Sequence, residues 1–178
     1  MMWRETDKAD PRCRRLADRH YSRQRPGHPF WTRPGFNFVL YAEGVSGAAV
    51  FCWFRPRWEV GQQRFDRLQA IECTIFRNET ELRSSDLIVE ALAAVQTWDH
   101  AIDTELRDGF ITGINSRATA GRRSKRALPG LCFREAGFVE FPHQARAADV
   151  WLRAERLPDA CRPVREPRGQ LSLIEAAR

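Results

Sequence analysis

Several features are scarce in this chain of 178 residues, and each scarcity excludes a class of protein. No apolar run approaches the roughly 20 residues that span a bilayer, and the N-terminal MMWRETDKAD lacks the apolar stretch of a signal peptide. The five cysteines are scattered and form no CxxC pair, which disfavours a disulfide framework and a structural zinc site and favours reduced thiols. We therefore expect a cytoplasmic protein without a membrane partner.

Lysine is also scarce, although the chain is basic. Lys8 and Lys125 are the only lysines, whereas the net charge is +6 and the pI is about 9.5. The positive charge is therefore carried by arginine, whose planar guanidinium binds phosphate in a bidentate manner and favours a nucleic-acid partner. A GC-rich genome would also raise the arginine content, but it would not cluster the arginines.

The order of apolar segments predicts an α/β fold. Residues 36–54 predict two buried strands around a turn at 44–47, residues 67–76 a third strand, and residues 84–102 a long helix. Further along the chain, the sequence predicts a strand at 109–114, a short helix at 131–138, and closing strands at 139–141 and 148–154. A strand–helix–strand order implies a parallel pair, so we expect a single domain with a mixed central sheet flanked by helices.

The two ends of the chain lack this pattern. Residues 1–35 are polar and basic, with a short helix expected near 11–20. Residues 156–178 are rich in proline and arginine, and we expect a linker over 156–169 followed by a tail. The predicted catalytic domain is therefore 1–155.

The segment 17–30, ADRHYSRQRPGHPF, concentrates groups that bind protons, metals or phosphate. It is either a basic arm or one wall of an active site. We expect the second, with His20 and Tyr21 facing the substrate and with Arg19, Arg23 and Arg25 facing phosphate.

A second candidate site is the strand–loop–helix IECTIFRNETELRSSDLI. Free N–H groups at a helix N-terminus favour an anion, so Arg77, Asn78, Ser84 and Ser85 are candidate donor-binding residues. Alternatively, the two serines cap the helix and the other two are turn residues. Glu72, on the preceding strand, could take a proton from an attacking amine or pair with an arginine.

The loop NSRATAGRRSKRALPG is a candidate DNA-binding element, since a basic loop can follow a phosphate backbone. Its positive residues are Arg117, Arg122, Arg123, Lys125 and Arg126. A solvated surface loop is the alternative. An enzyme that modifies a base inside a duplex must flip that base out and stack it on an aromatic ring, for which Tyr21, Trp31 and Phe36 are candidates.

The tail contains a possible partner motif. Gln170, Leu171, Ser172, Leu173 and Ile174 resemble the peptide with which bacterial DNA enzymes bind the sliding clamp. Glutamine would bond at the rim of a groove while Leu171, Leu173 and Ile174 fill it. The alternative is an amphipathic turn that packs on its own domain.

The order of elements resembles the GNAT acyltransferase fold, and three stretches resemble a narrower group. HYSR at 20–23 followed by Pro26, CTIFRNETELRSSDLI at 73–88, and GLCFREAGF at 130–138 are similar to segments of the Mom DNA-modification proteins of bacteriophages. The likeness covers residues 17–141.

This resemblance implies transfer of a carbamoylmethyl-type group to N6 of adenine in DNA, which protects phage DNA from restriction. The resemblance also implies an iron cofactor. It implies that His20, Tyr21 and Arg77 are functional residues, and that His20 and Tyr21 are candidate metal ligands. The family's aspartate falls at or near Asn115 and its tyrosine at Phe133. Both exchanges remove a ligand or proton donor, so the cofactor stays open.

Two alternatives remain from the sequence. An acetyl-CoA-dependent N-acetyltransferase acting on a small amine is disfavoured because the loop RNETELRSS contains no glycine. A non-catalytic DNA-binding module would need none of the proposed catalytic residues His20, Tyr21, Glu72 and Asn115.

Overall fold

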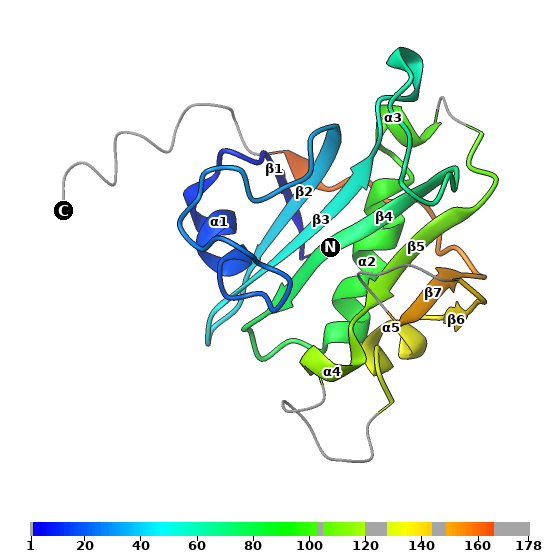
Figure 1. Ribbon diagram of the computed structural model, residues 1–178. Helices are drawn as coiled ribbons and strands as arrows, with labels where there is room; N and C mark the ends of the chain where they lie inside the picture. The colour runs from blue at the N-terminus through cyan, green and yellow to red at the C-terminus, as the bar shows by residue number, and fades with distance from the viewer. Residues whose placement is uncertain (1, 103–104, 120–127, 144–148, 166–178) are drawn as a thin grey trace.

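The computed structural model describes residues 2–102, 105–119, 128–143 and 149–165, and it confirms the α/β fold. Within these residues, eight strands form one mixed sheet in the order β6-β7-β5-β4-β3-β2-β1-β8 (Figure 1). The strands are β1 (Arg4–Thr6), β2 (Phe36–Glu43), β3 (Ala48–Arg55), β4 (Ala70–Asn78), β5 (Gly109–Ile114), β6 (Phe138–Glu140), β7 (Val150–Ala154) and β8 (Val164–Arg165). The helices are α1 (Pro11–Ala17), α2 (Ser84–Val95), α3 (Asp99–Ile102), α4 (Ser116–Thr119) and α5 (Leu131–Glu135), with a 3₁₀ turn at Trp58–Val60.

The centre of the sheet follows the sequence pattern. β2, β3 and β4 pair antiparallel, and β4 pairs parallel with β5 after the crossover through α2. The turn between β2 and β3 is closed by the hydrogen bond from Gly44 N–H to the Gly47 carbonyl at 2.8 Å. The predicted parallel pair on either side of the long helix is therefore confirmed.

The helix predicted over 84–102 is interrupted. α2 ends at Val95, and α3 is a separate turn. Gln96 and Thr97 donate side-chain hydrogen bonds to the carbonyls of Leu92 (3.1 Å) and Ala94 (2.8 Å). Such bonds satisfy the carbonyls that the last turn of a helix leaves without partners, so they stabilise an end at this point.

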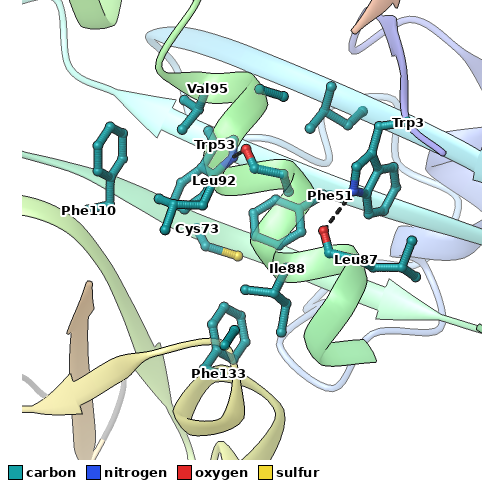
Figure 2. Packing of buried hydrophobic residues seen from close by; sticks show 14 of the residues in the cluster. Trp3, Phe51, Trp53, Cys73, Leu87, Ile88, Leu92, Val95, Phe110 and Phe133 are labelled. Atoms are coloured by element: carbon teal, nitrogen blue, oxygen red, sulfur yellow. Dashed lines mark hydrogen bonds between the residues drawn. The ribbon is translucent and has the colours of Figure 1, made fainter. Parts of the chain in front are cut away.

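The main hydrophobic core lies between the sheet and α2 with α5. Phe51 and Trp53 of β3 pack there against Ile88 and Leu92 of α2 (Figure 2). Trp3 is fully buried in the same core, and its indole N–H donates to the Leu87 carbonyl at 2.7 Å. Burial of an aromatic side chain contributes a large apolar area when its polar atom is bonded. The N-terminal segment is thus part of the fold.

The opposite face of the sheet is covered by α1 and by the segment after it (Figure 1). Leu16 and Trp31 pack there on Val39, Val50 and Ile75. The Trp31 indole N–H donates to the Lys8 carbonyl at 2.7 Å. Trp31 is therefore a core residue and is not available to stack on a base.

The prediction of a linker over 156–169 is wrong in part. Cys161 N–H donates to the Ala93 carbonyl at 3.1 Å, and the Gln96 side chain donates to the Pro158 carbonyl at 3.0 Å. β8 then pairs parallel with β1 at the edge of the sheet. Residues 156–165 thus belong to the fold, while the clamp-binding candidates Gln170, Leu171, Leu173 and Ile174 lie outside the described residues.

In the described part of the chain, every helix is too short or too polar to cross a bilayer.

Candidate functional site

The central feature of the site is the separation of β4 and β5. Their pairing begins at Ala70, opposite Gly109, and ends at Cys73, opposite Thr112. On its other side, β4 carries a bulge, because β3 pairs Cys52 with Ile75 and Trp53 with Cys73 and leaves Thr74 extra. A bulge bends the strand that contains it. The C-terminal half of β4 therefore diverges from β5.

A cavity of about 670 Å³ occupies this divergence. Its lining comes from both faces of the sheet. His20, Tyr21 and Arg77 lie on the α1 face, while Ser84 and Phe133 belong to α2 and α5 on the other face. The cavity therefore reaches both faces of the sheet, so two reactants could approach it from opposite sides.

An ion-pair cluster holds the segment that carries His20 and Tyr21 against β4. The Arg77 guanidinium donates to Glu79 and to the Arg19 carbonyl, each at 2.5 Å. Arg19 in turn donates to both Glu79 carboxylate oxygens at 2.8 and 2.5 Å. Arg77 lines the cavity, and these bonds through its Nε and Nη1 give it a positioning role. Its donor-binding role stays a prediction.

Tyr21 is the best placed proton donor in the cavity. Burial raises the pKa of its phenol, and a hydrogen bond with the Asn115 backbone offsets part of this rise. The phenol is therefore protonated at neutral pH. The His20 ring packs on the Tyr21 ring with centroids 4.3 Å apart, and its Nδ1 lies 2.7 Å from the Ser22 hydroxyl.

Asn115 contacts Tyr21 through its backbone. Its side-chain oxygen accepts from Ala118 N–H at 2.9 Å, as an N-cap residue does at the start of a helix. The side chain thus stabilises α4, and the predicted catalytic role of its amide gains no support from this geometry.

The loop between β4 and α2 is closed by its own side chains. The Asn78 oxygen accepts from Thr80 N–H (2.9 Å), and the Thr80 hydroxyl accepts from Leu82 N–H (3.0 Å). The Asn78 amide donates to the Leu82 carbonyl at 2.7 Å. These N–H groups are consumed within the loop, so they are not free to hold a pyrophosphate.

Ser84 and Ser85 do not cap α2, so the alternative interpretation in which these serines are capping residues is wrong. The N-cap residue is Arg83, and no side chain caps the helix. Ser84 lines the cavity and accepts from the Asn78 amide at 3.2 Å. Ser85 is buried, and its hydroxyl has no partner among the described residues. The uncapped first turn of α2 next to Ser84 is thus the place where the cavity can attract an anionic group.

Glu72 is placed apart from the cavity lining. Its Oε2 accepts from Arg33 at 2.7 Å and also from Arg64, whose side chain is fully buried. This arrangement matches the alternative interpretation, in which Glu72 pairs with arginine. The general-base role stays a prediction without geometric support.

The candidate DNA-binding residues fall into three groups. Arg117 is exposed and lines the cavity, and Arg25 is exposed on the loop that follows Tyr21. Arg23 is mostly buried, because its guanidinium bonds Asp18 and two carbonyls of the same loop. The remaining candidates, Arg122, Arg123, Lys125 and Arg126, lie outside the described residues.

Of the candidate aromatic platforms, Tyr21 alone lines the cavity. Phe36 instead stacks on His100, with ring centroids 3.7 Å apart, and Trp31 belongs to the core.

An iron site does not fit the residues of the cavity. No group of three or more His, Cys, Asp or Glu side chains converges anywhere in the described ranges. Burial raises the pKa of the Cys73 thiol well above its usual value, and burial also keeps the Tyr21 phenol protonated. His20 and the Cys132 thiol would then remain as ligands in the lining, which falls short of the two histidines and one carboxylate that typically hold a non-haem iron.

Several lining residues were missed by the sequence interpretation. They are Cys73, Thr112, Gly130 and Cys132. Gly130 has φ +69°, and a Cβ there would lie 2.7 Å from Leu152 Cδ1, so only glycine lets the chain approach β7 this closely. The Pro-Gly pair before α5 was the available signal.

No protein-family model, curated protein or solved structure matches this chain. Its function is therefore inferred from the chemistry of the cavity and from the resemblance of its motifs.

Proposed function

We propose that this chain is a GNAT-like transferase that adds a small acyl or carbamoylmethyl group to an exocyclic amine of a DNA base, with N6 of adenine as the acceptor. The observation that carries the proposal is the cavity between β4 and β5, which holds His20 and Tyr21 on one face of the sheet and the start of α2 on the other. The motifs similar to the Mom proteins supply the substrate class.

The transfer requires a proton acceptor and a proton donor. The amine nitrogen forms a bond to the donor carbon while the bond from that carbon to its leaving group breaks. His20 takes the proton released by the amine, and the protonated Tyr21 phenol gives a proton to the leaving group. General acid–base catalysis of this type contributes a factor of about 10² to 10⁴.

The donor binds from the α2 side. The uncapped first turn of α2 favours a negatively charged group beside Ser84. The closed loop over Asn78 and Thr80 argues against an acyl-CoA, because a pyrophosphate needs free loop N–H groups. The proposal therefore favours a smaller donor.

The acceptor binds from the α1 side, next to Arg25 and Arg117. Both are exposed, and the net charge of the chain is +6, so phosphate contacts support a DNA substrate. A base that reaches Tyr21 must leave its duplex, and the aromatic ring of Tyr21 offers a surface on which the base can stack.

The test is a nucleoside analysis. Bacteria expressing the wild-type chain are compared with bacteria expressing Tyr21→Phe or His20→Ala, and their DNA is digested and analysed by mass spectrometry. We expect a heavier deoxyadenosine with the wild type and at least a roughly 100-fold lower yield with each variant. Arg107→Ala, an exposed change outside the cavity lining, serves as the matched control and should leave the yield unchanged.

The alternatives give different outcomes. Unmodified nucleosides together with acetylation of small amines by acetyl-CoA would replace the proposal with a small-molecule acetyltransferase. Unmodified nucleosides together with DNA binding that survives Tyr21→Phe would indicate a non-catalytic DNA-binding module.

A further inference from the structure

The loop after Tyr21 is held by the Arg23–Asp18 ion pair and the hydrogen bonds that these two side chains make. Arg23 donates to Asp18 at 2.7 Å and to the carbonyls of His28 and Phe30 at 2.5 and 3.0 Å. The second oxygen of Asp18 accepts from Gly27 N–H at 2.9 Å. This network spans the loop from its beginning to its end, so residues 22–30 form a braced loop although most of their side chains are exposed.

The braced loop carries an aromatic side chain that is mostly exposed. Phe30 is 76% exposed, whereas its neighbour Trp31 is buried in the core. The Phe30 ring contacts His28 of the same loop, with ring centroids 5.5 Å apart, whereas the exposed ring of Phe65 lies against Trp151 of β7 at 6.4 Å. Exposure of most of a phenyl ring forgoes the stabilisation that burial would contribute.

The braced loop begins at the cavity. Arg23 lies two residues after the cavity residue Tyr21, and it bonds directly to the Phe30 backbone. The same loop carries Arg25, which is exposed and positively charged. An exposed apolar ring, a rigid support and a phosphate-binding side chain are therefore combined next to the residues that face the substrate.

We propose that Phe30 is a wedge that enters the base stack when the substrate base is flipped toward Tyr21. The inference rests on the proposed function, since it requires a base in duplex DNA as the substrate. Flipping a base leaves a gap in the stack and costs unstacking and unpairing. Apolar side chains inserted between base steps stabilise such a distorted duplex. Because the loop is already ordered, Phe30 loses little conformational entropy when it inserts.

The experiment measures binding to two DNA probes that each contain a 2-aminopurine. One probe is a duplex with this base paired to thymine, and the other is the same strand alone. We expect Phe30→Ala to weaken binding to the duplex by about tenfold but to change binding to the single strand by less than about twofold, since a single strand has no stack to open. We also expect the duplex fluorescence to rise with the wild type and to stay low with Phe30→Ala.

Two further variants make the test specific. Phe65→Ala removes another exposed phenyl ring elsewhere and should change neither binding nor fluorescence. Phe30→Trp keeps an aromatic wedge and should restore the fluorescence rise. Equal losses on both probes with Phe30→Ala, or no loss on either, would overturn the wedge while leaving the proposed function intact. Wild-type protein that binds neither probe would instead reject DNA as the substrate, and the wedge with it.

Discussion

The two halves of the β4–β5 pair differ sharply, although they belong to the same two strands. In the first half, Ala70 and Ile111 are fully buried. Beside them, Glu72 is bound by Arg64. In the second half, beyond Cys73, the strands separate and a cavity of about 670 Å³ replaces the core.

This difference shows how the fold separates stability from chemistry. Charged groups in the paired half are buried and bound to one another, so they stabilise loops around the sheet. Polar groups in the diverged half line a space that a ligand can enter, and their segment is held by Arg19, Arg77 and Glu79. Three substitutions test this division, in addition to the experiments proposed above.

Arg64→Met should have the largest effect, because it breaks the ion pairs of the paired half. The Arg64 side chain is fully buried and donates to Asp66 and Glu72. Removing one partner leaves uncompensated buried charge, which costs 3–5 kcal/mol in general. Since Arg33 still binds Glu72, we expect a loss of about 3 kcal/mol in the free energy of unfolding, measured by urea denaturation.

The control for this prediction is Arg107→Met, which removes an exposed ion pair with Glu105 at 3.5 Å. It should cost less than about 0.5 kcal/mol. Similar small losses for both variants would mean that the paired half does not depend on its buried charges.

Gly130→Ala should have an intermediate effect, at the wall of the diverged half. Its φ is +69°, and an added Cβ would meet Leu152 at 2.7 Å and Ile114 at 3.1 Å. Left-handed backbone and steric overlap together should cost about 2–3 kcal/mol. Thermal unfolding followed by circular dichroism measures this loss.

Gly61→Ala separates the two contributions. Gly61 has φ +78° with nothing within 4 Å of the added Cβ, so it should cost only the backbone part, about 1 kcal/mol. Equal costs for the two variants would show that the cavity wall yields to an added methyl group.

Glu79→Gln should have the smallest effect and a defined pH dependence. The hydrogen bond from Arg19 lowers the pKa of Glu79 from 4.5 to about 2. The pKa is depressed in the folded state, so this stabilisation is present above pH 4.5 and is lost as the pH falls toward 2. We expect the variant to lose about 1 kcal/mol or less at pH 7 and progressively less below pH 4.5.

Unfolding temperatures at pH 7 and pH 3 check this prediction. Glu105→Gln, which loses only the exposed pair with Arg107, should show a small deficit at pH 7. A deficit of Glu79→Gln that stays constant from pH 7 to pH 3 would contradict the proposed charge dependence.

The elements that the sequence predicts well are those with a strong local pattern. The apolar runs of β2, β3 and β5 and the start of α2 were expected at nearly their observed positions, because the apolar period depends on neighbouring residues. The end of α2 at Val95 was not expected. β1 and β8 were missed because they have only three and two residues. Their pairing depends on residues far away in the chain, since Arg4 of β1 lies between Tyr41 of β2 and Val164 of β8.

The candidate site was predicted in part. His20, Tyr21, Arg77, Asn78, Ser84 and Arg117 all line one cavity. The roles of the arginines were harder to predict, because a sequence does not show which guanidinium groups are bound by a carboxylate in the folded chain. Arg23 forms an ion pair with Asp18, and Arg77 forms one with Glu79. Arg25 and Arg117 are exposed.

The sequence by itself determined the α/β class, the parallel β4–β5 pair and the presence of a basic, aromatic segment next to His20 and Tyr21. Only the tertiary structure decided that a bulge at Thr74 opens the sheet, that Glu72 is bound by Arg64, and that Phe30 is exposed on a braced loop. The physical reason is that local pattern depends on neighbouring residues, while ion pairing, burial and strand separation depend on distances between segments that only the folded chain brings together.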